Sequence, residues 1–247
     1  MPMISGKRVI AAMLTTLMAV TFTANTAVSV YATGVTATEN AQTIDAQSTD
    51  AQALTPEEQK AQELQQVYDM PVESNGYKDW PQGPGTYGEA GIVMEVGTGA
   101  ILYAKNIDAH EYPASITKVL TALVALENGQ LTDNVTFSHD SVAFLQRGDS
   151  SVGLKEGNVI TLDQAMHAML LASANEAAYA IGESVGVNAG HDYNWFIEQM
   201  NSRCKELGGE NSNFANTNGL HDPNHYTCAR DMALIGRELF KHPEFFQ

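Results

Sequence analysis

Two pairs of polar residues in this sequence of 247 residues have a spacing that suits nucleophilic catalysis. The first pair is Ser115 and Lys118, in the segment Pro-Ala-Ser-Ile-Thr-Lys that opens an apolar run. Residues three apart share one face of a helix. A lysine amine among apolar neighbours loses its proton readily and can then deprotonate an adjacent hydroxyl. By itself the pair is more typical of a serine that caps a helix and a lysine in solvent, so a second element has to decide.

The second pair is Ser173 and Asn175, in the segment Leu-Leu-Ala-Ser-Ala-Asn-Glu that follows another apolar helix. Residues two apart do not face each other on a helix but do so in extended backbone, so the helix must break near Ala172 if they act together. Ser173 would then pass a proton between Lys118 and a leaving amine, and Asn175 would hydrogen-bond a substrate amide. The alternative is a junction between two helices, where polar caps are routine.

Together the two pairs match two of the three motifs of penicillin-binding proteins and class A β-lactamases, Ser-x-x-Lys and Ser-x-Asn. A third block, Phe-Ala-Asn-Thr-Asn-Gly-Leu-His-Asp-Pro-Asn-His-Tyr, begins at Phe214. With these blocks in order, residues 89–240 resemble the D-alanyl-D-alanine carboxypeptidases, the low-molecular-mass penicillin-binding proteins. The resemblance implies a β-lactamase/transpeptidase-like fold.

The resemblance also implies a reaction. A serine enzyme of this family removes the terminal D-alanine from peptidoglycan stem peptides, and β-lactams inhibit it by acylating the same serine. Carried onto this sequence, Ser115 is the acylated nucleophile, Lys118 its base, Ser173 the proton shuttle and Asn175 a substrate-binding residue. No metal and no organic cofactor is implied.

The family's third motif, Lys-Thr-Gly, does not occur in the sequence, and Lys155-Glu156-Gly157 lies too early to replace it. We interpret the sequence as truncated before that motif, so that the C-terminal strands and any C-terminal membrane anchor are missing. The chain as given is then either an inactive part of an enzyme or a penicillin-binding or peptidoglycan-binding remnant without turnover.

Two other hydrolase types were weighed. A class A β-lactamase needs a deacylating glutamate, for which Glu210 has roughly the right separation from the Ser-x-Asn element, but Phe214 stands where that loop should carry an asparagine. A zinc hydrolase would use His221, Asp222 and His225, although no further ligand outside this segment is evident and a turn explains the segment equally well.

Charge and cysteine content limit the partners. The formal net charge of −16 opposes binding to nucleic acid and to anionic membrane surfaces, so membrane contact is expected only through a C-terminal anchor, if there is one. The two cysteines, Cys204 and Cys228, either pair in an oxidising compartment or remain separate thiols. Neither belongs to a Cys-x-x-Cys or zinc-like spacing.

The N-terminal part predicts export. Residues 1–32 combine Lys7 and Arg8 with an apolar stretch and a small-x-small site, as in a cleaved secretory signal peptide; an uncleaved N-terminal anchor is the alternative. Either one places the domain outside the cytoplasm, at the cell wall or the outer face of the cytoplasmic membrane. Residues 33–80, rich in Ala, Gln, Thr and acids, predict a disordered linker in which 56–68 form a loose helix at most.

Residues 81–247 are expected to form the N-terminal part of the penicillin-binding catalytic domain, an α+β domain of mixed sheet and helices. Two β-type runs around Gly97-Thr98-Gly99 predict a hairpin. Apolar periodicity predicts a helix over 115–127 that ends at Asn128-Gly129. Thr161 and Gln164 form a capping box that opens a helix reaching Leu171. Further helices are expected over 176–185, 192–207 and 229–240.

Overall fold

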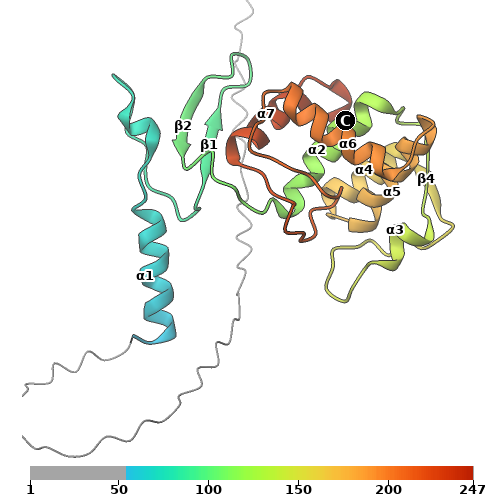
Figure 1. Ribbon diagram of the computed structural model, residues 1–247, viewed down its shortest axis with the longest axis horizontal. Coiled ribbons are helices and arrows are strands. Elements are labelled where there is room, and N and C mark those ends of the chain that lie inside the picture. Colours follow the sequence, from blue (N-terminus) through green and yellow to red (C-terminus); the bar gives the residue numbers. More distant parts are fainter. Residues whose placement is uncertain (1–53, 247) are drawn as a thin grey trace, which may run out of the picture. The chain divides into compact units, whose positions relative to one another are not determined.

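The computed structural model describes residues 54–246 (Figure 1), which all belong to one compact unit, residues 52–247. The predicted signal peptide and the first part of the predicted linker lie outside the described residues. Helices and short strands are mixed in the described unit, which is the predicted α+β class. Within residues 54–246, no helix combines the length and the apolar character that crossing a bilayer needs.

The described unit begins with helix α1 (Pro56–Tyr68), where the sequence predicts a loose helix, and this corrects the prediction of disorder for these residues of the linker only. Thr55 and Glu58 cap this helix reciprocally, and Pro56 suits its first turn. A 3-10 turn, η1 (Glu73–Gly76), follows it. α1 buries no residue of its own, so its composition resembles that of a linker, and a contact from elsewhere in the chain reaches its last turn.

That contact is Lys105, a fully buried residue at the end of strand β2. Its ammonium donates to the carbonyl oxygens of Val67 at 2.6 Å, Thr86 at 2.6 Å and Gly88 at 2.9 Å. A buried cation is costly unless its donors are satisfied, and here three carbonyls satisfy them. Lys105 thereby joins the last turn of α1 and the segment before the hairpin to β2.

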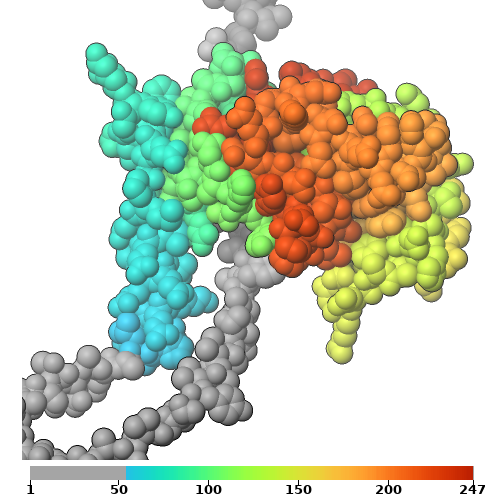
Figure 2. Space-filling view, viewed as in Figure 1, coloured from blue at the N-terminus to red at the C-terminus, as the bar shows by residue number. Residues whose placement is uncertain are grey.

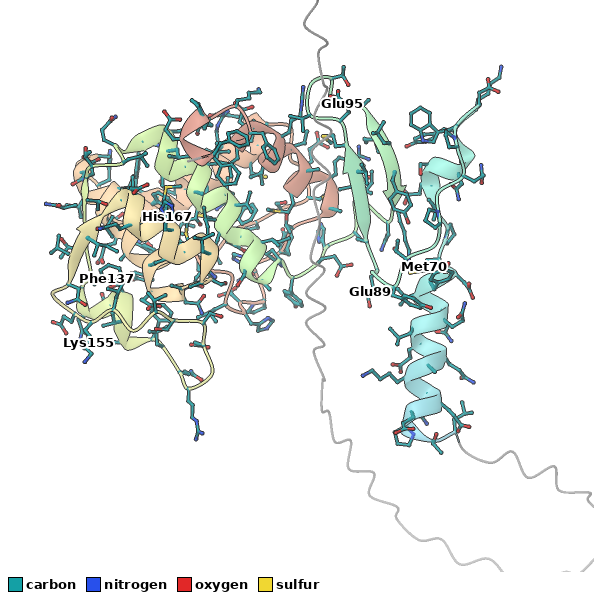
Figure 3. The ribbon with its side chains drawn as sticks, turned by 180° about the vertical axis from the view of Figure 1, so that it is seen from behind. Met70, Glu89, Glu95, Phe137, Lys155 and His167 are labelled. Atoms are coloured by element: carbon teal, nitrogen blue, oxygen red, sulfur yellow. The ribbon has the colours of Figure 1, made fainter. Side chains whose placement is uncertain are left out.

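The predicted hairpin is present as β1 (Gly91–Met94) and β2 (Ile101–Lys105), paired antiparallel with Gly91 opposite Lys105. Glu95 lies at its tip (Figure 3), where its carboxylate accepts hydrogen bonds from the Thr98 hydroxyl and from the Thr98 and Gly97 amides. These bonds, with the Thr98 hydroxyl first, lower the pKa of Glu95 to about 2. The turn is therefore closed by an ionised side chain throughout the neutral range.

The rest of the described unit is mainly helical. Helix α2 (Thr117–Asn128) lies at the centre of the helices, and its residues from Leu120 to Ala125 are buried. The segments that follow α2 are β3 (Asn134–Thr136), α3 (His139–Ala143), β4 (Val159–Thr161), α4 (Leu162–Leu171), α5 (Asn175–Asn188), α6 (Tyr193–Glu206), α7 (Ala229–Leu239) and a final 3-10 turn, η3 (Pro243–Phe246).

The core lies between α2 and its neighbours α4, α5, α6 and α7. In the space-filling view, the orange and red atoms of the C-terminal helices cover the middle of the visible face (Figure 2). α7 also reaches the hairpin, because Arg237 donates to the carbonyls of Val96 at 2.7 Å and Gly97 at 2.9 Å.

Most predicted helix bounds agree with the structure to within a few residues, including the stop at Gly129 and the Thr161–Gln164 capping box. Strands β3 and β4 were not predicted. They pair antiparallel over three residues each, which is too short for an alternating pattern to be recognised.

Candidate active site

Ser115 lies in a 3-10 turn, η2 (Ala114–Ile116), directly before α2 rather than inside its first turn. Its side chain is exposed. Ala114 adopts a positive φ of 47°, a conformation that L-residues rarely occupy. Gly219 packs against it so closely that a Cβ on Gly219 would overlap the Ala114 carbonyl. The turn that presents Ser115 is thus braced from a segment a hundred residues further along the chain.

Lys118 lies beneath Ser115 and is only 2% exposed. Its amine is 3.1 Å from Ser115 Oγ, 2.9 Å from Asn175 Oδ1 and 2.7 Å from the carbonyl oxygen of Asn218. An ammonium would donate to all three oxygens. In the neutral amine, the two carbonyl-type acceptors still take the two N–H groups, so the lone pair is left facing Ser115 Oγ. The surroundings therefore direct the basic form at the serine hydroxyl.

Burial shifts the electrostatic balance at Lys118 toward that form. Burial lowers the pKa of the amine from its ordinary value to about 8, while the negative charge of Glu176 acts in the opposite direction. With a pKa of about 8, roughly a tenth of the molecules carry the neutral amine at pH 7. A general base works best when its pKa lies near the working pH.

Ser173 lies between α4 and α5, where the chain leaves helical geometry as predicted. Helix α4 ends at Leu171, Ser173 has a φ of 56°, and α5 begins at Asn175. The Ser173 hydroxyl donates to Ser115 Oγ at 2.8 Å. The break turns Ser173 toward the nucleophile, which a continuous helix would not do.

Asn175 is 4% exposed and occupies the first position of α5. Its Oδ1 accepts from Lys118, which orients the amide so that the Nδ2 donors remain for another acceptor. Together, Ser115, Lys118, Ser173 and Asn175 form one hydrogen-bonded group drawn from two segments of the chain, residues 115–118 and 173–175. The structure brings all four predicted site residues together.

The Peptidase S11 family model, described as D-alanyl-D-alanine carboxypeptidase, matches residues 81–247. The chain belongs to this family. Among curated members, it is 33% identical to the D-alanyl-D-alanine carboxypeptidase DacF of Bacillus subtilis (strain 168), over 62% of this chain and 39% of that protein. It is 34% identical to the carboxypeptidase DacA of Haemophilus influenzae, over 61% of this chain and 38% of that protein.

Solved structures of the same group share the fold. Penicillin binding protein 5 from Haemophilus influenzae matches with a TM-score of 0.58 and 32% identity, over 65% of this chain and 47% of that chain. The Streptomyces K15 DD-transpeptidase matches with a TM-score of 0.57 and 28% identity, over 62% of this chain and 60% of that chain. The predicted transpeptidase-like fold is thereby confirmed. The S11 family chain spans about two fifths of the length of the curated relatives named above.

Two contributors to the site of this S11 family member were not predicted. Asn218 accepts from Lys118 through its main-chain carbonyl, and Gly219 braces Ala114. Asn216 holds this turn, because its Oδ1 accepts from the amides of both residues at 3.3 and 2.7 Å. A carbonyl leaves no trace in the residue type, so only the Asn-Thr-Asn-Gly turn pattern signalled the position.

The histidines proposed as alternative zinc ligands have other roles in the S11 chain. His225 is buried, its Nδ1 accepts from the Ala215 amide at 2.9 Å, and its Nε2 lies 2.8 Å from the Thr117 hydroxyl. Burial lowers the pKa of His225 to about 4, so the ring stays neutral. His221 packs edge-on against Tyr112. Among residues 54–246, no group of three potential ligands is placed to hold a metal ion.

Glu210, the candidate for a lactamase deacylating glutamate, lines a separate hollow with Asp108, Arg230 and Asp231. None of the four predicted site residues lines that hollow, so the structure gives Glu210 no part in the site.

Cys204 and Cys228 are separate, buried thiols in the structure. Burial raises the pKa of each to about 11. Cys228 caps α7, accepting from the Asp231 amide at 3.4 Å.

Proposed function

We propose that the protein is an exported D-Ala–D-Ala carboxypeptidase that removes the terminal D-alanine from peptidoglycan stem peptides through an acyl-enzyme on Ser115. The observation that carries the proposal is the Lys118 amine, which is buried, held by two carbonyl oxygens and directed at the Ser115 hydroxyl. Membership of the carboxypeptidase family supplies the substrate class.

In the first step, the neutral Lys118 amine takes the proton of Ser115 while Oγ attacks the carbonyl carbon of the penultimate D-alanine. The oxyanion that forms needs hydrogen-bond donors. The Ser115 amide is a suitable donor, because it makes no hydrogen bond among the described residues and lies at the start of a helical segment. Asn175 Nδ2 is suited to hold a carbonyl of the peptide.

In the second step, the bond between the carbonyl carbon and the leaving nitrogen breaks, and the nitrogen must receive a proton. Ser173 is suited to pass the proton on from Lys118, since its hydroxyl lies 2.8 Å from Ser115 Oγ, which is also 3.1 Å from the Lys118 amine that holds the removed proton. Water then attacks the ester, again with Lys118 as base, and frees Ser115. A β-lactam would enter at the first step and leave a covalent adduct.

The test is covalent labelling by a fluorescent penicillin. Because the chain spans about two fifths of the length of its curated relatives, full-length DacF of Bacillus subtilis is assayed beside the 247-residue chain as a reference. We expect one labelled band that is lost in Ser115→Ala and kept in Ser202→Ala, a matched change at an exposed serine on α6. Labelling that survives Ser115→Ala would remove this serine from the proposal.

Release of D-alanine from a pentapeptide, measured on the same samples, separates turnover from binding alone. Labelling without D-alanine release would favour a penicillin-binding protein without carboxypeptidase activity. Export is tested by sequencing the N-terminus of the secreted protein, which should begin after residue 32.

A further inference from the structure

Glu176 is a fully buried acidic residue that the proposed proton transfers do not use. It follows Asn175 in the first turn of α5. Carboxylates are seldom buried completely unless their charge is compensated by donors or by an opposite charge. The groups around Glu176 therefore indicate why the charge is kept there.

The first set of contacts joins Glu176 to residues 151–153 of the loop 150–153. Its Oε1 accepts from the Ser151 hydroxyl at 2.7 Å, the Val152 amide at 2.8 Å and the Gly153 amide at 3.1 Å. The neighbouring residue binds the same loop, because the main-chain amide of Asn175 donates to the Ser150 carbonyl at 2.9 Å. Three donors on one oxygen are typical of an ionised acceptor. The loop is thus attached to the start of α5, beside the Ser173–Asn175 turn.

The second relation is electrostatic and concerns Lys118. The other oxygen, Glu176 Oε2, is buried and has no hydrogen-bond partner within residues 54–246. Its neighbour Asn175 bonds the Lys118 amine at 2.9 Å, and the charge of Glu176 raises the pKa of that amine against the effect of burial. Glu176 and Lys118 are therefore opposite charges in one buried region, separated by a neutral amide.

The other groups near this region are neutral or act on other residues, so Glu176 is the charge that acts on Lys118. The loop contributes the neutral residues 150–153, the end of α4 contributes neutral Ser173, and the turn before Gly219 contributes neutral Asn218. Acidic groups further along, Asp140 on α3 and Glu183 on α5, act on Tyr179 instead. Lys155 follows the loop and is exposed (Figure 3).

We propose that Glu176 is a positioning residue for the acyl transfer, which holds residues 150–153 against the Ser173–Asn175 turn with one oxygen and acts on the Lys118 amine through its charge. The kinetic part of this inference rests on the proposed function. The two structural parts concern groups of this chain alone and are measurable without any substrate.

The central variant is Glu176→Gln, which keeps the shape and removes the charge. The Lys118 amine, identified in spectra of ¹³C-lysine-labelled protein by its absence from Lys118→Arg, should then titrate at lower pH than in the wild type. Amide hydrogen exchange at Val152 and Gly153 should become about tenfold faster, because hydrogen bonds to a charged acceptor are stronger than those to a neutral one. The matched control is Glu183→Gln, which changes another carboxylate with a buried, unpartnered oxygen on α5 and should alter neither measurement.

A purely structural role would change the exchange rates but not the lysine titration. Glu176→Asp separates the two parts further, since it keeps the charge near Lys118 while shortening the reach to the loop. In Glu176→Asp, we expect the Lys118 amine to titrate at a pH close to that in the wild type, and amide hydrogen exchange at Val152 and Gly153 to be faster than in the wild type. It also replaces Glu176→Gln as the deciding variant if the glutamine protein does not fold.

The acylation rate with penicillin provides the kinetic measurement. In Glu176→Gln, the rise of rate with pH should move to lower pH and reach a lower plateau, because the base is deprotonated more easily but is weaker. If wild-type protein is not labelled by penicillin, the proposed function fails, while titration and exchange still decide the role of Glu176. If wild-type protein is labelled but Glu176→Gln shows an unchanged titration and unchanged exchange, the inference about Glu176 is overturned and the proposed function stands.

Discussion

The pH dependence of acylation tests the role of Lys118 most directly. The neutral amine is the form that can take the Ser115 proton, and burial lowers the pKa of Lys118 to about 8 with Glu176 opposing. The group gains basic function as it loses its proton, so acylation should rise with pH through about 8 and level off above it. With a histidine as the base, the acylation rate would rise at a pH about one to two units lower.

The size of the effect follows from the same value. With a pKa of about 8, the neutral fraction is about 1% at pH 6, about 9% at pH 7 and about 50% at pH 8. The second-order rate constant for acylation should therefore increase about 50-fold between pH 6 and pH 8, and by less than about twofold beyond pH 9. Lys118→Arg, which keeps a cation but cannot act as a base, should be at least about 100-fold slower at every pH.

The assay is stopped-flow or quenched labelling with a penicillin under pseudo-first-order conditions from pH 5.5 to pH 9.5. Ser115→Ala measures hydrolysis of the β-lactam by hydroxide alone, and circular dichroism of each variant excludes loss of fold. A rate that stays constant between pH 6 and pH 9, or a Lys118→Arg protein that acylates at a near-normal rate, would refute the assignment of Lys118 as the base.

Two further predictions concern the supports of the site. Gly219→Ala should lower the free energy of unfolding by more than about 2 kcal/mol, because it adds a backbone overlap with Ala114 to the cost of a positive φ. Gly190→Ala, which has the same kind of φ and open space around its Cβ, should cost only about 1 kcal/mol; equal losses in urea unfolding would contradict the close approach. Cys204 and Cys228 should resist a thiol reagent in the native protein and react after denaturation, since burial raises the pKa of both to about 11. Rapid labelling of either thiol in the folded state would contradict the burial of that thiol.

The local sequence pattern was sufficient to predict those features whose signals lie within a few residues of one another. The Thr161–Gln164 capping box, the glycine after Asn128 and the break near Ala172 are short-range features, and each appears where the sequence predicts it. Helix α1 was predicted only as a loose helix within a linker, and strands β3 and β4 were not predicted, for a common reason. Their order depends on partners far along the chain, such as Lys105 for α1 and the pairing of Val135 with Ile160 for the strands.

For the site, motif spacing was enough to name Ser115, Lys118, Ser173 and Asn175 as candidates and to indicate the family. The sequence by itself could not show how the Lys118 amine is held. That depends on a main-chain carbonyl at Asn218, on a glycine that lets Ala114 adopt its strained turn, and on a buried carboxylate at Glu176. Side-chain type and spacing determine which groups can do chemistry. Burial determines the protonation state of those groups, and hydrogen bonds determine their orientation. Burial and these hydrogen bonds arise only when distant segments pack together.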